Sequence, residues 1–230
     1  MDNTIQQLSR KERERLFKRQ EIIQAAREVF SLRGFTSATL DEIAEKAEFG
    51  KGTLYSYFQS KDELFDTVLA DMFEEFVSIA AEACSDPEKE IEESYTDFAR
   101  ALLRHLFENY GMYYLLIREM HKMEHQSHFA TLFPNLLLII AEPLKRNLPA
   151  ENLKENAAEQ LGFMFLTLIL SLFRSSLHIL GQRHCYEQAT TLDLSSDEIQ
   201  HQIDHNIALL RQVYFNGVLS MKKTGNSRHT

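Results

Sequence analysis

Apolar residues recur at three- and four-residue spacing along most of the chain, which is the period of a helix buried on one side. In residues 18–33 this spacing puts five apolar side chains on one face: Ile22, Ala25, Ala26, Val29 and Phe30. Gly34 follows directly and predicts the end of this helix, because glycine takes left-handed backbone conformations without strain.

Two short helices are predicted next, over about 40–47 and 51–58, with residues 48–50 as the turn between them. Thr39 is the expected N-cap of the first helix, and Glu42 three residues later completes a capping box. Ser60 is the expected cap of a longer helix that runs to about residue 84.

The remaining pattern predicts larger helices, with a loop at 184–196 and a flexible tail at 222–230. The expected ranges are 88–109, 112–124, 128–147, 152–182 and 197–221. Pro134 and Pro143 predict a kink or a break in one of them, because proline lacks an amide hydrogen. The sequence therefore predicts an all-α protein of about nine helices.

The composition of the chain excludes several other classes of protein. Eight glycines and four prolines in 230 residues are too few for the frequent turns of a sandwich or barrel. Two cysteines cannot form a disulfide framework or a four-thiolate zinc site. There is no Gly-rich phosphate loop, nucleophile elbow or His-Glu-x-x-His motif, so no enzyme activity is expected.

The first residues and the longest apolar run indicate where in the cell the protein is expected. The first 19 residues are polar and charged, with no apolar core of a secretory signal. The run from 161 to 172 is shorter than a membrane span, and we interpret it as a buried helix. A cytoplasmic protein without a membrane partner is expected.

Charge is distributed unevenly. The net charge is −9, which is not typical of a nucleic-acid binder, and residues 66–230 account for all of it. Residues 1–20 instead hold six basic side chains against three acidic ones. We interpret residues 1–17 as a basic arm that adds a minor-groove or backbone contact to DNA. The alternative is a solvated helix face.

Two short helices joined by a tight turn suggest a helix-turn-helix, since neither is long enough to be stable alone. In that motif the second helix enters the major groove of DNA. Leu54 and Phe58 fit the core. Donors, ring faces and room for a close phosphate approach are offered by Lys51, Gly52, Thr53, Tyr55, Tyr57 and Lys61.

Residues 39–65, TLDEIAEKAEFGKGTLYSYFQSKDELF, resemble the DNA-binding signature of TetR-family transcriptional regulators. The preceding IIQAAREVFSLRGFTSAT is similar to that family's first helix and connector. The resemblance implies a three-helix DNA-binding domain at 18–65 and a larger helical domain at 66–221 for effector binding and dimerisation. It places DNA contacts at Thr39, Lys51, Thr53, Tyr55, Tyr57 and Lys61.

The turn departs from the family pattern, which usually reads Gly-Val-Ser where this chain has Glu48-Phe49-Gly50. Glu48 replaces a glycine that often has positive φ, so retaining that geometry costs about 1 kcal/mol. Gly50 replaces a serine cap, which puts a side-chain contact to phosphate there in doubt.

For the larger domain, the resemblance implies a homodimer through the last two long helices. The expected interface residues are Leu168, Leu172, Ser175, Leu210, Val213 and Tyr214. It also implies an effector pocket for a small apolar or aromatic molecule, lined by Phe98, Leu102, Tyr113, Tyr114, Ile117, Met120, Phe163 and Met164. The alternative for these side chains is ordinary packed core.

His121, His125 and His128 share one helical face, a spacing that can ligate a transition metal. The ligand set is incomplete, so we expect no metal cofactor and interpret the histidines as a solvent-exposed cluster. The resemblance to TetR-family regulators implies a repressor that a small-molecule effector releases from a palindromic operator. The rival is a helical protein-interaction module without DNA binding, which the net charge and Glu48 favour.

Overall fold

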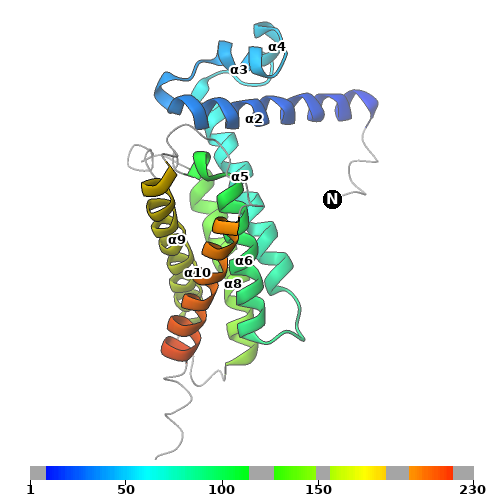
Figure 1. Ribbon diagram of the computed structural model, residues 1–230. Coiled ribbons are helices and arrows are strands. Elements are labelled where there is room, and N and C mark those ends of the chain that lie inside the picture. Colours follow the sequence, from blue (N-terminus) through cyan, green and yellow to red (C-terminus); the bar gives the residue numbers. More distant parts are fainter. Residues whose placement is uncertain (1–8, 114–126, 149–155, 185–196, 220–230) are drawn as a thin grey trace, which may run out of the picture. The chain divides into compact units, whose positions relative to one another are not determined.

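The computed structural model describes residues 9–113, 127–148, 156–184 and 197–219, and every regular element in these ranges is helical (Figure 1). The predicted all-α class is confirmed. The chain divides into two compact units, Met1–Met72 with Gly111–His128, and Phe73–Tyr110 with Phe129–Thr230. Each unit is described by itself below.

The first unit contains helices α2 (Arg10–Ser37), α3 (Leu40–Lys46) and α4 (Lys51–Tyr55) and the first half of α5 (Lys61–Cys84). Helix α2 begins eight residues before the predicted position 18, because Ser9 and Glu12 form a capping box there. Gly34 interrupts α2 with φ 75° and ψ 163°, a conformation open only to glycine, so its predicted role as a helix stop is confirmed.

Burial explains why two such short helices form. The predicted stripe of α2 is buried, with Ile22, Ala26 and Phe30 fully enclosed, and α3 and α4 contribute Ile43 and Leu54 to the same core. Burying each large apolar side chain contributes about 1.5–3 kcal/mol, which offsets the cost of ordering helices of seven and five residues.

An ion pair joins α2 to α5 at the edge of this core. The Arg27 guanidinium lies 2.8 Å from a carboxylate oxygen of Asp71, and the Gln20 amide donates to the same oxygen over 3.4 Å. The Arg27 side chain is 11% exposed, so solvent screens this pair less than a surface pair. The pair thus ties the first half of α5 to α2 within this unit.

The second unit contains the end of α5 together with α6 (Ile91–Glu108), most of α8 (Ser127–Asn147), α9 (Ala157–His184), α10 (Asp197–Leu210) and the π-helix η4 (Arg211–Leu219). Helix α10 packs against α6, α9 and η4 (Figure 1). Helix α8 is continuous through Pro134 and Pro143, so no break occurs where the prolines predicted a kink or a break.

Aromatic rings form the centre of the second unit. The Tyr95 and Phe165 ring centroids lie 4.3 Å apart, and Phe165 and Tyr214 lie 4.8 Å apart. The Tyr95 hydroxyl donates to the Ile140 carbonyl over 2.7 Å, and the Tyr214 hydroxyl donates to the Leu161 carbonyl over 2.8 Å. Each buried phenol thus has a partner, as burial of a polar group requires.

A buried polar chain sets the register of α9 against α10. The Asn206 side-chain amide donates to the Ser176 hydroxyl over 2.8 Å, and that hydroxyl donates to the Leu172 carbonyl over 2.8 Å. Both polar side chains are buried, so a shift of one helix along the other would leave them without partners.

Helix α9 is also unusually apolar. The stretch Ala157–Ile179 is long and apolar enough to cross a membrane by length and composition, and a third of it is buried within the chain. It is longer than the run of 161–172 expected from the sequence. Core helices of helical bundles meet the same criterion, and the packing of Phe165 and Ile169 inside the second unit follows that pattern.

Cys84 is predicted to be unreactive in the folded protein. Burial raises the pKa of this thiol to about 12, although the Arg146 guanidinium, which donates to the Cys84 carbonyl over 2.8 Å, opposes the shift. The thiolate is the reactive form, so iodoacetamide at pH 8 should label native Cys84 on the order of a thousandfold more slowly than the unfolded chain. Mass spectrometry of the Cys84 peptide measures this; equal labelling rates would contradict the buried position.

Candidate nucleic-acid interface

The start of α3 is built as the sequence predicted. The Thr39 hydroxyl accepts from the Glu42 amide over 3.2 Å, and the Glu42 carboxylate accepts from the Thr39 amide over 2.9 Å, which completes the capping box. The Thr39 hydroxyl also donates to the Glu42 carboxylate over 2.9 Å, and this bond, together with the one from the Thr39 amide, lowers the pKa of Glu42. The cap holds Thr39 at the exposed amino-terminal end of α3.

The turn between α3 and α4 carries the predicted strain. Glu48 has φ 57°, in the left-handed region that disfavours a side chain, and the Phe49 amide closes the turn by donating to the Ala44 carbonyl over 2.9 Å. Gly50 is the N-cap of α4 and makes no side-chain cap. The two departures from the family pattern therefore have the structural consequences expected of them.

Replacing Glu48 by glycine should stabilise the protein by about 1 kcal/mol, because glycine takes the left-handed conformation without a clash. The midpoint of urea-induced unfolding measures the gain. Glu48→Ala is the matched control, since it removes the same charge and keeps a Cβ atom in the strained position. Equal stabilisation by both substitutions would mean that the charge, not the backbone, is responsible.

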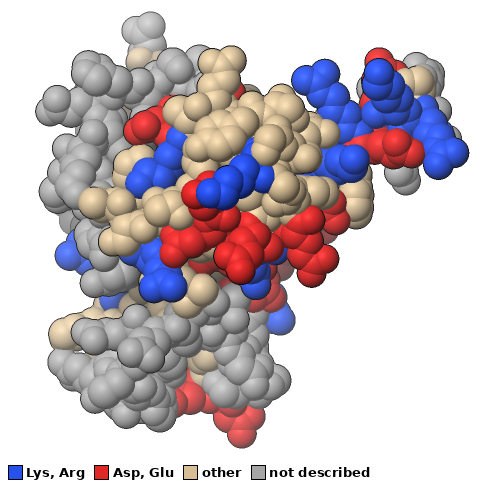
Figure 2. Space-filling view, turned by 90° about the horizontal axis from the view of Figure 1, so that it is seen from above, with Lys and Arg blue, Asp and Glu red and all other residues tan. Residues whose placement is uncertain are grey.

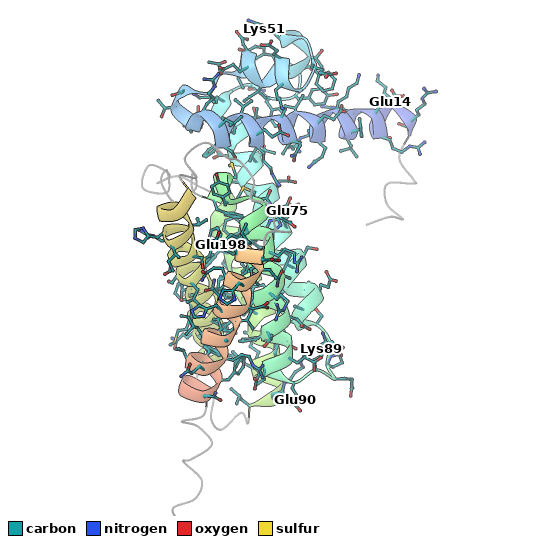
Figure 3. All side chains as sticks on the ribbon, viewed as in Figure 1. Glu14, Lys51, Glu75, Lys89, Glu90 and Glu198 are labelled. Atoms are coloured by element: carbon teal, nitrogen blue, oxygen red, sulfur yellow. The ribbon has the colours of Figure 1, made fainter. Side chains whose placement is uncertain are left out.

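Helix α4 separates its buried and exposed residues cleanly. Leu54 is buried, Lys51, Gly52 and Tyr55 are exposed and Thr53 is half-buried. The helix ends at Tyr55, before the predicted end at about 58, and the following Tyr57 and Phe58 are half-buried and buried. A Cβ atom at Gly52 would meet nothing within 4 Å, so the backbone there is open to a close approach. Figure 3 shows Lys51 at the outer side of the α3–α4 pair. The DNA contacts at these positions stay predictions.

Two interactions of the candidate contact residues were not foreseen from the sequence. The Lys51 ammonium forms an ion pair with Asp41 of α3, although ten residues separate them. The Lys61 ammonium donates to the carbonyls of Thr36 and Ala38 and lies 4.7 Å from the Phe35 ring centroid. Lys61 thus braces the α2–α3 connector, whether or not it also reaches a phosphate. Sequence spacing gives no signal for either contact.

The predicted effector residues fall into three groups. Phe98 and Leu102 on α6 are fully buried and Tyr113 is 3% exposed, whereas Tyr114, Ile117 and Met120 lie outside the described residues. Phe163 and Met164 are 43% and 48% exposed. The interior position expected for these last two is wrong, because the described residues leave both side chains exposed on α9, although the edge of the Phe163 ring meets Phe133 of α8 with centroids 5.9 Å apart.

The residues predicted to form the dimer interface differ in their exposure. Leu168 and Leu172 are half-buried, while Ser175 and Val213 are exposed and so remain candidates for an interface. Leu210 and Tyr214 are 2% and 1% exposed in the single chain, because they pack into its core. Their assignment to the dimer surface is therefore wrong.

The histidine cluster remains a prediction. His121 and His125 lie outside the described residues, as does the side chain of His128. Within the described part of the chain, no group of His, Cys, Asp or Glu side chains is placed to hold a metal ion. His201 and His205 are both exposed on α10.

Comparison with known proteins agrees with the geometry of the first unit. The family model described as "Bacterial regulatory proteins, tetR family" matches residues 22–68, which span most of α2, all of α3 and α4 and the start of α5. Over these residues the chain is therefore similar to TetR-family regulators. The match covers the elements on which the sequence resemblance rested.

Among curated relatives, the uncharacterized HTH-type transcriptional regulator YhgD of Bacillus subtilis is 39% identical over 62 residues, which are 27% of this chain and 32% of YhgD. The transcriptional repressor NicS of Pseudomonas putida is 35% identical over 78 residues, 33% of this chain and 37% of NicS. The transcriptional activator FasR of Mycolicibacterium smegmatis is 43% identical over 61 residues, 26% of this chain and 28% of FasR. The chain thus matches about a third of the length of these relatives.

Solved structures match over nearly their whole length and agree on the fold. A TetR-like transcriptional regulator from Rhodococcus sp. RHA1 superposes with TM-score 0.58 at 22% identity, covering 88% of this chain and 96% of that one. FadR from Bacillus subtilis, in complex with stearoyl-CoA, superposes with TM-score 0.62 at 16% identity, covering 83% and 96%. The second unit therefore has the fold of the larger domain in these regulators.

Proposed function

We propose that this protein is a sequence-specific, DNA-binding transcriptional regulator that acts as a homodimer in the cytoplasm. The observation that most supports this proposal is the arrangement of α4. This five-residue helix buries Leu54 and leaves Lys51, Gly52 and Tyr55 exposed. Donors at a helix start, next to free amide groups, suit the phosphates and base edges of DNA. In this proposal α3 braces the backbone and α4 enters the major groove.

The proposed dimer uses the side of α9 that the described residues leave exposed. The face carries Phe163, Met164, Leu170 and Ile179, each at least 38% exposed, with the small residues Ser171 and Ser175 between them. Covering these solvent-exposed apolar side chains with a second copy of the chain contributes about 25 cal/mol of favourable free energy for each Å² that is buried. Two-fold symmetry then matches a palindromic operator whose half-sites are about one helical turn apart.

We further propose that a small apolar molecule bound in the second unit controls DNA binding. The unit's interior is rich in aromatic side chains around Phe98, Tyr95 and Phe165. FadR, a structural neighbour, has stearoyl-CoA bound in its structure, which supports an apolar effector class for this chain. By linkage, effector and operator then each weaken the binding of the other by the same factor.

The regulator is proposed to be a repressor, as NicS is, with the operator lying over a promoter. FasR is an activator, so the sign is tested by transcription from a promoter that carries the selected operator. Added protein should lower transcript yield. A rise in yield would assign activation and leave the DNA-binding proposal intact.

Selection of bound fragments from random duplex tests the proposal. The full chain should enrich a two-fold symmetric sequence, and the logarithm of its affinity should fall linearly with the logarithm of salt concentration. A protein-interaction module without DNA binding would enrich no sequence and show no such dependence. That outcome would contradict the proposal.

A further inference from the structure

The amino-terminal part of α2 is a helix without a buried face. Every residue from Ser9 to Glu21 is exposed except Arg19, which is half-buried, and the buried stripe of the helix begins only at Ile22. Leu16 and Phe17 are 49% and 65% exposed. In Figure 1 this segment extends past α3 and α4. Hydrophobic burial, which usually stabilises a helix, therefore does not explain it.

Charge distinguishes this segment from the rest of the chain. Between residues 10 and 19 there are six basic and two acidic side chains, in a protein whose net charge is −9. Figure 2 shows the basic side chains gathered over this end of α2. Glu14 pairs with Arg10 over 2.8 Å, and Glu12 is held in the capping box with Ser9, so both acids are engaged locally. The amino-terminal segment of α2 therefore has an excess of positive charge, which favours binding to a polyanion.

One face of the amino-terminal segment of α2 adjoins the turn that follows α4. Glu12, Arg15, Leu16 and Arg19 line a shallow surface depression together with Tyr57, which is one of the candidate DNA-contact residues. The Arg19 guanidinium lies 5.2 Å from the Phe58 ring centroid, so its position is fixed against the residue that follows Tyr57. Arg15 stands one helical turn before Arg19 on this face.

We propose that Arg15 and Arg19 bind the phosphate backbone of DNA beside the half-site that α4 reads, a proposal that rests on the proposed DNA-binding function. Of the two contacts expected for this basic segment, a rigid helix favours the one to the backbone, because an α-helix is too wide for the minor groove. From Arg10 to Arg19 it spans about 14 Å, which corresponds to about four base pairs of duplex. The protein therefore covers more DNA than α3 and α4 alone would cover.

Arg15→Gln/Arg19→Gln in the full chain tests this. Each lost phosphate contact lowers the slope of log affinity against log salt by about 0.9, so two lost contacts per chain lower it by about 2, or by about 4 in a dimer. Affinity should fall on the selected operator and on unrelated duplex by the same factor. Arg15→Lys/Arg19→Lys, which keeps both charges, should restore most of the slope.

Arg13→Gln is the matched control, because Arg13 is exposed, as Arg15 is, but lies about 140° around the helix from the Arg15–Arg19 face. It should leave the slope unchanged. An equal effect of Arg13→Gln would overturn the proposed face in favour of diffuse attraction, and a wild-type slope in Arg15→Gln/Arg19→Gln would overturn the contact. If the wild-type chain binds no duplex at all, the proposed function itself fails.

Discussion

Alanine at both Lys51 and Tyr55 should lower affinity for the selected operator by roughly 10- to 100-fold, the expected cost of losing specific contacts worth about 1–3 kcal/mol in total. Both side chains are exposed, so the fold and the dimer should remain intact. Titration of labelled operator by fluorescence anisotropy measures the change, and sedimentation of the same samples checks the assembly state.

Lys46→Ala is the matched control for this pair of substitutions. Lys46 is 51% exposed and pairs with Glu28 over 2.7 Å, much as Lys51 pairs with Asp41, but it lies at the far end of α3 from Thr39. Its replacement should change affinity less than twofold, a difference within the usual range of surface substitutions. Similar losses in both variants would show that general positive charge, not the α4 side chains, determines binding.

Glutamate at both Met164 and Leu170 should convert the dimer into monomers. In a two-fold interface each substitution occurs twice, and burying charges without partners costs several kcal/mol per ion. Both residues are exposed in the single chain, so the second unit should still fold. Sedimentation should then give a species of 26.8 kDa at concentrations where the wild-type chain has twice that mass.

The control for this substitution is Leu138→Glu, on α8. Leu138 is 49% exposed, almost the same as Met164, but it does not belong to the α9 face. The control should sediment as the wild-type chain does. A dimer that persists in Met164→Glu/Leu170→Glu would mean that this face of α9 is not the contact between copies.

Local features of the first unit were predictable from the sequence because they depend on residues close together in the chain. The Thr39–Glu42 capping box, the stop at Gly34 and the strained Glu48 each follow from a spacing of a few residues and from the conformations that each side chain allows. The buried stripe of α2 likewise follows from helical periodicity alone.

Features that depend on which helix covers another could not be predicted in the same way. Periodicity identified Tyr214 and Phe163 as apolar helix positions. It gave no sign that α6 and α9 cover Tyr214, or that the described residues leave Phe163 43% exposed. The Lys51–Asp41 pair and the Lys61 contacts to Thr36 and Ala38 join separate elements for the same reason. The start of α2 at Arg10 was missed because its first three turns have no buried face.

Methylation interference on the selected operator tests most directly whether α4 reads the major groove. Methyl groups on guanine N7 lie in the major groove, and those on adenine N3 lie in the minor groove. N7 methylation should block binding at two symmetric sets of positions about 10 base pairs apart, one for each copy of α4. Interference confined to adenine N3, or no interference at any base, would contradict the placement of Lys51, Thr53 and Tyr55 at base edges.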